Sequence, residues 1–184
     1  SWPCASSGFG GRSGDREAPL TEAGSAVAIH YASDDLEGRI GAALEVAGMA
    51  TGTLSPRDLA PLDQIHGGGW EATVAHADGI AIGAEAHVLD VGSGIGGPAR
   101  YLAERFGCRV TGLDLTEAFY DVATMLTGRT GQDDHVTFRH GDALAMPFAD
   151  AAFDVVWSQS AAMNIADRST LYGEIHRVLK PGGT

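Results

Sequence analysis

The feature that most constrains the fold is a glycine-rich run at residues 90–98, Asp-Val-Gly-Ser-Gly-Ile-Gly-Gly-Pro. A short apolar stretch at 87–91 precedes it and predicts a strand. After the glycine-rich run, residues 99–106 predict a helix, which Gly107 stops. Glycines at such a junction let the backbone turn tightly and let a ligand approach, while the helix N-terminus offers free N–H groups. The run therefore predicts a strand–turn–helix unit that binds a small molecule.

Strands and helices continue to alternate after this unit. Further strands are predicted at residues 109–113, 135–139 and 153–157, and further helices at 116–126 and 167–179. Such alternation implies right-handed crossovers and a parallel sheet. We therefore expect an α/β fold, a Rossmann-like doubly wound parallel sheet, over residues 84–184.

The first 83 residues have a different pattern. Residues 1–28 are rich in Gly and Ser and lack an apolar period, so we expect a disordered tail. Residues 29–83 are expected to form an N-terminal helical cap, with helices at 34–49 (capped by Ser33), 55–65 and 70–77.

Charge and composition narrow the partners. The formal net charge is −12, which repels phosphate backbones, so we expect no nucleic-acid partner and a small, neutral or cationic substrate. No apolar run is long enough to predict a membrane span, and no secretory signal is seen. The two cysteines, Cys4 and Cys108, suggest free thiols rather than a metal site or disulfide framework, and so a cytoplasmic protein.

The glycine run by itself leaves two ligand classes open. Gly92, Gly94 and Gly97 also satisfy the pattern of a dinucleotide site, and Asp114, at the end of the second strand, suits the ribose hydroxyls of either ligand. The acid Asp90, just before the first glycine, favours S-adenosylmethionine (SAM).

Taken together, the motifs resemble those of class I SAM-dependent methyltransferases. Residues 90–96 resemble motif I, 112–114 the end of the second strand, 141–143 the adenine-binding turn, 153–156 the fourth strand and 177–183 the turn into the fifth. The family's sheet normally has seven strands. We therefore expect a sheet that is C-terminally truncated after strand four.

Three shorter segments resemble one branch of that family. Residues 62–68, 96–100 and 163–165 are similar to sarcosine/dimethylglycine N-methyltransferases, whose relatives include tocopherol and phosphoethanolamine methyltransferases. The resemblance implies N-methylation of a small amine. O- or C-methylation of a small metabolite, and a truncated SAM-binding module without activity, remain alternatives.

The resemblance and the chemistry of the groups assign roles to individual residues. Asp114 is expected to accept hydrogen bonds from the ribose hydroxyls and Asp142 from the adenine amino group, with the Ala143 N–H on a ring nitrogen. Gly92 and Gly94 are expected against the methionine part. The full predicted cofactor set is Asp90, Gly92, Ser93, Gly94, Gly96, Asp114, Leu115, Asp142, Ala143, Ser158 and Gln159.

The predicted substrate side is Gln64, Met163 and Asn164, with His66 and Tyr31 as candidate catalytic bases and no metal. Met163 also suits the core. Two roles are open for the Arg100 side chain: an ion pair on its own helix or a contact to the SAM carboxylate.

Overall fold

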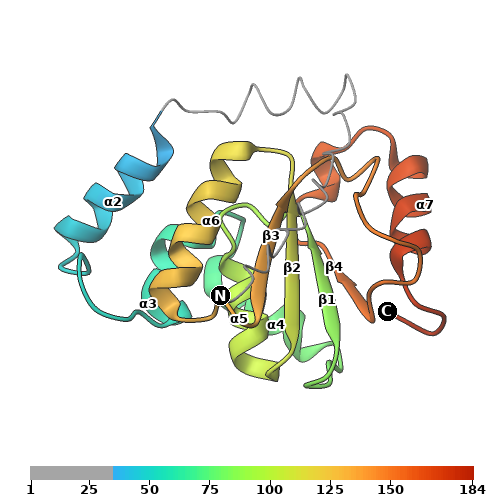
Figure 1. The fold of residues 1–184 in the computed structure, drawn as a ribbon, viewed down its shortest axis with the longest axis horizontal. Helices are drawn as coiled ribbons and strands as arrows, with labels where there is room; N and C mark the ends of the chain where they lie inside the picture. Colours follow the sequence, from blue (N-terminus) through green and yellow to red (C-terminus); the bar gives the residue numbers. More distant parts are fainter. Residues whose placement is uncertain (1–34) are drawn as a thin grey trace, which may run out of the picture.

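A computed structural model describes residues 35–184 (Figure 1). The predicted tail at 1–28, Tyr31 and the predicted cap Ser33 lie outside these described residues. The elements are α2 (Leu36–Val46), α3 (Pro56–Asp63), α4 (Gly69–Asp78), β1 (His87–Val91), α5 (Gly97–Phe106), β2 (Arg109–Asp114), α6 (Glu117–Thr130), β3 (Val136–His140), β4 (Val155–Trp157), the 3-10 turn η1 (Ala162–Asn164) and α7 (Arg168–Val178).

The four strands form one parallel sheet in the order β3-β2-β1-β4. Asp90 on β1 pairs with Gly112 on β2 and with Trp157 on β4, while Asp114 on β2 pairs with His140 on β3. Since all strands run the same way, their carboxyl ends gather at one edge, the upper edge in Figure 1. The predicted parallel α/β sheet is confirmed.

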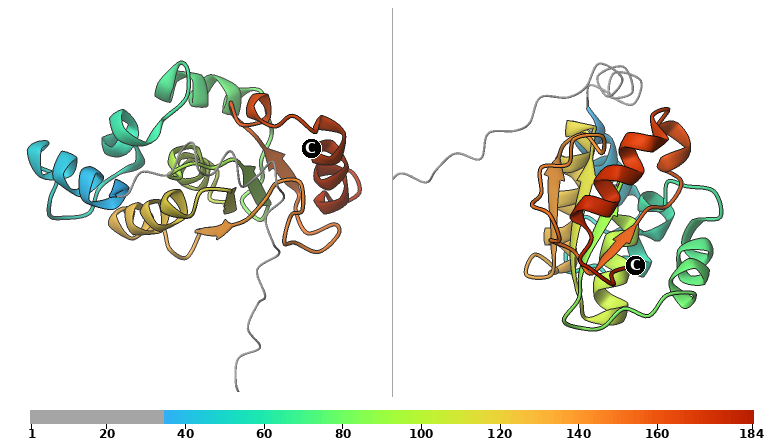
Figure 2. Two further views of the ribbon diagram at one scale, coloured as in Figure 1. Left: turned by 90° about the horizontal axis from the view of Figure 1, so that it is seen from above. Right: turned by 90° about the vertical axis from the view of Figure 1, so that its right-hand side faces the viewer.

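Helices cover both faces of the sheet, as a doubly wound fold requires (Figure 2). Successive strand residues point to opposite faces. Val88 and Val110 accordingly pack with the buried residues of α4, α5 and α6. Leu89 and Val91 pack on the other side with α7 and the loop before β4.

The N-terminal helices attach to the α5–α6 side of the sheet. Leu44 and Leu59, from α2 and α3, pack against Ile95 of the glycine run and Leu126 of α6. The predicted capping box of α3 is present, because Ser55 and Asp58 each bond the other's backbone N–H. In Figure 1, α2 and α7 mark opposite ends of the long axis.

Several local predictions differ from the structure. The helix after β2 runs to Thr130 rather than 126, because Gly131 (φ 66°) provides the left-handed residue that ends it. Thr116 occupies its N-cap position, but the Thr116 side chain makes no capping hydrogen bond. The prediction that Met163 belongs to the core is wrong, since it is 73% exposed next to the short turn η1.

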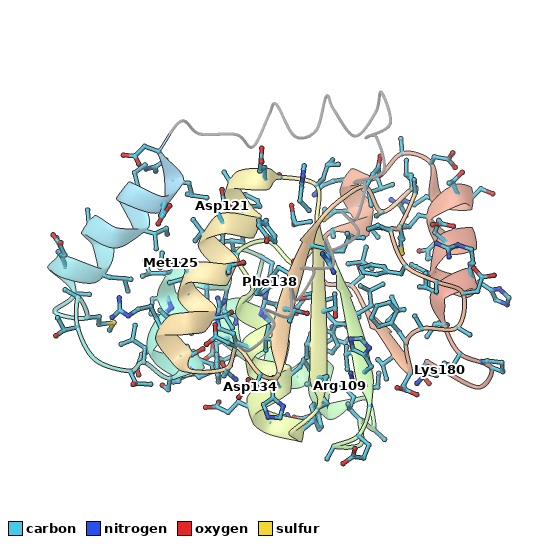
Figure 3. The ribbon with its side chains drawn as sticks, viewed as in Figure 1. Arg109, Asp121, Met125, Asp134, Phe138 and Lys180 are labelled. Atoms are coloured by element: carbon cyan, nitrogen blue, oxygen red, sulfur yellow. The ribbon has the colours of Figure 1, made fainter. Side chains whose placement is uncertain are left out.

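Lys180 anchors the sheet at its lower, amino-terminal edge, where Figure 3 labels it. Lys180 Nζ donates to Asp154 Oδ1 at 2.8 Å, and Asp154 Oδ2 accepts from the His87 backbone N–H at 2.9 Å. Thr184 exchanges two backbone hydrogen bonds with β4, through Val156 N and Asp154 O.

No helix among residues 35–184 is long and apolar enough to cross a membrane.

Candidate cofactor and active site

A cavity of about 280 Å³ opens at the carboxyl ends of the strands. Residues from all four strand ends, the glycine run, the α3–α4 segment and the turn η1 line it. They are Asp63, Ile65, His66, Asp90, Gly92, Ser93, Gly94, Pro98, Leu113, Asp114, Leu115, Thr116, Phe119, Gly141, Asp142, Ala143, Leu144, Gln159, Ser160, Ala161, Asn164, Ile165 and Ala166.

The glycine run forms a tight wall of this cavity. Gly92 and Gly94 have φ of 75° and 54°, a conformation that side chains disfavour. A Cβ on Gly92 would collide with the Cβ of Ala161, and one on Gly94 would lie 3.0 Å from Ile65 Cδ1. The Gly92 N–H donates to Leu113 O at 2.8 Å, which fixes the run on β2. The turn can thus hold a ligand against bare backbone.

Asp90 lies at the base of the cavity, at the end of β1. It is 1% exposed, and its Oδ2 has no hydrogen-bond partner. Burial and, to a smaller extent, the nearby charge of Asp114 together raise the pKa of Asp90 to about 7. An unpartnered buried acceptor facing a cavity suits a ligand that donates hydrogen bonds or carries positive charge.

Asp114 stands at the carboxyl end of β2 and is held by two backbone donors. Its Oδ2 accepts from Gly94 N at 2.8 Å and its Oδ1 from Thr116 N at 2.9 Å. Burial raises its pKa, while these N–H donors oppose the shift. A carboxylate oxygen has two lone pairs, so each oxygen retains a lone pair for ligand hydroxyls.

The turn after β3 forms another wall of the cavity, on the side of the sheet where α7 packs. Gly141 N donates to Asp114 O at 2.9 Å, which ties this turn to β2. Asp142 is buried, and its Oδ1 accepts from Leu144 N at 2.8 Å. Ala143 lies between them and lines the cavity. The predicted adenine-binding turn therefore reaches the same cavity as Asp90 and Asp114.

Arg100 neither forms an ion pair within its own helix nor lines the cavity, the two roles that the sequence suggested. Its Nη2 donates to Asp63 Oδ2 of α3 at 2.9 Å and to Ile95 O at 2.6 Å, and both charged side chains are fully buried. Its Nη1 donates to Ala123 O and Thr127 Oγ1 of α6. Arg100 thus joins α3, the glycine run, α5 and α6 behind the cavity.

A polar network lies on the other side of the glycine run. His66 Nε2 is 3.0 Å from both Gln64 Oε1 and Thr73 Oγ1. Its Nδ1 is 3.3 Å from Gly67 O and 3.4 Å from Gln159 Nε2. This network connects the α3–α4 segment to the end of β4.

The structure brings most of the predicted site residues to one cavity. Gly96, Ser158, Gln64 and Met163 do not line it: Gly96 turns the chain into α5, and Ser158 Oγ donates to Val91 O. Several lining residues are not among the site residues predicted from the sequence, including Ile65, Thr116, Phe119, Leu144 and Ile165. Ile65 and Ile165 adjoin predicted residues, whereas Phe119 gives no signal until α6 is placed.

The charge of the lining restricts the ligand. The lining includes four Asp residues and His66, but no Lys or Arg among the described residues. Arg100 pairs with one of the four, Asp63, and the other three, Asp90, Asp114 and Asp142, also line the space. Such a lining disfavours a pyrophosphate and favours a ligand with positive charge and several donors.

Residues 89–184, more than half of the chain, match the family described as a methyltransferase domain. The chain belongs to this family. Among relatives, it is 41% identical to the glycine/sarcosine/dimethylglycine N-methyltransferase of Actinopolyspora halophila over 115 residues, 62% of this chain and 20% of that protein. It is 42% identical to a sterol 24-C-methyltransferase of Gibberella zeae over 113 residues, 61% of this chain and 29% of that protein.

A solved structure extends the likeness to the N-terminal helices. The geranyl diphosphate C-methyltransferase from Streptomyces coelicolor A3(2) superimposes with a TM-score of 0.62 at 26% identity, over 90% of this chain and 64% of that one. The chain thus spans less than a third of the two curated relatives and under two thirds of this structure. These methyltransferases act on different atoms, so family membership does not define the acceptor.

Proposed function

We propose that this methyltransferase-family chain binds SAM in the cavity and transfers its methyl group to a small molecule. The observation that carries the proposal is the convergence of Asp90, Asp114 and Asp142 on one glycine-walled cavity to which residues 35–184 contribute no Lys or Arg. SAM has hydrogen-bond donors on its ribose, adenine and ammonium groups and a positive sulfonium. When bound, it supplies an electrophilic methyl group.

Three parts of the cavity suit three parts of SAM. The free lone pairs of Asp114 would accept from the ribose hydroxyls, and Asp142 with the Ala143 N–H would hold the adenine. Gly92 and Gly94 line the same cavity and would contact the methionine part through their backbone.

Methyl transfer depends more on how the two reactants are positioned than on acid–base catalysis. The nucleophile has to approach in line with the carbon–sulfur bond, in a site without competing water. Leu113, Phe119, Leu144 and Ile165 give the cavity apolar walls that exclude water. These walls and the fixed glycine run would orient the reactants.

For the acceptor, we propose a small amine, such as sarcosine or dimethylglycine. The N-methyltransferase relative and the acidic balance of the chain support this choice. His66, which lines the cavity, is the base that would take the proton of an ammonium substrate. The sterol C-methyltransferase relative makes carbon methylation the second candidate.

Labelled SAM, offered in parallel with amine, phenol and carbon-acid acceptors to the full protein, tests this function. Label on the amine products supports the proposal. Label only on oxygen or carbon products would reject the amine and retain methyl transfer. SAM binding without any transfer would instead identify a non-catalytic SAM-binding module.

A further inference from the structure

Thr73 of α4 is completely buried and contacts His66, although Thr73 itself does not line the cavity. We propose that Thr73 and Gln64 hold His66 in the tautomer with its proton on Nε2, so that Nδ1 is the basic atom offered to the cavity. The inference rests on the proposed function, in which His66 takes up the proton of the acceptor. Thr73 and Gln64 are then positioning residues, because they act through His66.

The surroundings of Nε2 require a proton there. Thr73 Oγ1 has one hydrogen, which it donates to Gln64 Oε1 at 2.6 Å or to Gln159 Oε1 at 3.2 Å. In either case it has only lone pairs left for His66 Nε2 at 3.0 Å. Gln64 Oε1, also 3.0 Å from Nε2, is an acceptor too. With two acceptors around it, Nε2 donates.

The surroundings of Nδ1 suit a nitrogen that gains and loses a proton. Gln159 Nε2 is an amide donor 3.4 Å away, which matches a bare Nδ1. Gly67 O is an acceptor 3.3 Å away, ready to bond Nδ1–H once the ring is protonated. Gln159 lines the cavity, whereas Gln64 and Thr73 do not. Nδ1 is thus the ring nitrogen in direct contact with Gln159, whereas Nε2 reaches Gln159 only through Thr73.

The proton transfer balances with methyl transfer. The substrate N–H bond breaks and its proton forms a bond with His66 Nδ1, which leaves a lone pair on the substrate nitrogen. That lone pair forms the new bond to the methyl carbon, and the carbon–sulfur electron pair stays with sulfur. The Nδ1–H of the imidazolium then donates to Gly67 O, and solvent removes the proton afterwards.

This arrangement also explains why Gln64 is present away from the cavity. The sequence predicted that Gln64 contacts the substrate, but Gln64 Oε1 instead contacts Thr73 and His66. A buried amide oxygen and a buried hydroxyl that satisfy each other give a rigid pair of acceptors. Their position fixes both the ring orientation and the tautomer of His66.

Long-range ¹H–¹⁵N NMR of the protein labelled at its seven histidines measures the tautomer directly, without substrate. Loss of one signal set in His66→Asn assigns His66. We expect the neutral wild-type ring to carry the proton on Nε2. In the double variant Gln64→Leu/Thr73→Val, which lacks both acceptors, we expect the Nδ1–H form to become dominant, because Gly67 O then is the nearest acceptor.

Thr73→Ser, which keeps the hydroxyl, is the matched control and should retain the wild-type tautomer. A wild-type ring protonated on Nδ1 would overturn the inference, whether or not the double variant folds. So would an unchanged tautomer in a double variant that still binds S-adenosylhomocysteine. In the transfer assay, the double variant should lose about tenfold or more in kcat at unchanged S-adenosylhomocysteine affinity. Absence of transfer by the wild type would reject the proposed function and leave the NMR test of the tautomer standing.

Discussion

At the scale of single residues, Asp90 combines a binding role with a cost in stability. Its raised pKa, about 7 against an ordinary 3.8, means that the folded protein keeps a proton that the unfolded chain has already lost. Stability contributed by Asp90 therefore falls as pH rises from about 4 to about 7 and stays low above that range. The unpartnered Oδ2 is the structural origin of this loss.

We therefore predict that Asp90→Asn gains stability over wild type as pH rises. The gain at pH 8 relative to pH 5 should be at most about 3 kcal/mol, because only the two units or so between pH 5 and the folded pKa of about 7 contribute, at about 1.4 kcal/mol per unit. Urea unfolding at both pH values measures it. Asp154→Asn provides the opposite control, because Lys180 lowers the pKa of Asp154 and stabilises the fold when that group is ionised. An Asp90→Asn difference that does not change with pH would contradict the prediction.

Asp114→Ala tests whether this acid binds the cofactor or only holds the loop. Loss of charge-assisted hydrogen bonds to the ribose, each worth about 1.5–3 kcal/mol, should weaken SAM binding at least about tenfold. Calorimetric titration with SAM measures the change. Asp121→Ala, which removes an exposed acid of α6 outside the cavity lining, is the control and should bind normally. A folded Asp114→Ala protein with unchanged affinity would show that Asp114 is structural.

Gly92 and Gly41 form a matched pair of glycines at the same scale. Gly92 has φ 75° and no room for a Cβ beside Ala161, whereas a Cβ on Gly41 of α2 meets nothing within 4 Å. We expect Gly92→Ala to abolish SAM binding and lower stability. Gly41→Ala should raise the free energy of unfolding by about 0.5–1 kcal/mol, as for an exposed helix interior. Thermal unfolding and SAM titration of both variants distinguish the two cases, and a Gly92→Ala protein that binds SAM normally would refute the first.

At the scale of elements, the buried pair Asp63–Arg100 joins the cap helix α3 to α5 and α6. Arg100→Met leaves Asp63 buried without a partner, so we expect a loss of about 3–5 kcal/mol. The double variant Asp63→Leu/Arg100→Met removes both charges and should be more stable than Arg100→Met alone. A double-mutant cycle from urea unfolding measures the coupling, and additive losses would contradict it.

Element positions followed well from local signals, and element ends followed less well. Ser55 with Asp58 and Asp167 with Thr170 are caps formed within four residues, so the sequence revealed the starts of α3 and α7. The end of α6 depends on Gly131, five residues beyond the predicted stop, and on packing that admits another turn. A local sequence pattern carries no information on how the last turn of α6 packs.

At the scale of the whole molecule, some residues of the site could be predicted from the sequence and others only from the fold. Asp90, Asp114 and Asp142 end successive strands or follow them, so a parallel sheet brings them to one edge, and the sequence predicts their meeting. The partners of Arg100 in α3 and α6 lie between 23 and 37 residues away along the chain, and only the folded chain reveals them. Thr73 was likewise unforeseen, because it contacts Gln159 across 86 residues.

The charge of the whole chain and of its cavity leads to a final prediction about ligand choice. SAM carries one net positive charge, S-adenosylhomocysteine none and NAD one negative charge, while the chain carries −12 and the cavity lining no Lys or Arg among the described residues. We expect SAM and S-adenosylhomocysteine to bind and NAD not to bind. Because salt screens charge beyond about 10 Å at about 0.1 M, added salt should weaken SAM binding and leave S-adenosylhomocysteine binding nearly unchanged. Calorimetric titrations of the three ligands at low and high salt measure both effects. Tight NAD binding without a response to S-adenosylhomocysteine would reject the cofactor assignment, whereas equal salt responses of SAM and S-adenosylhomocysteine would reject only the role of cavity charge.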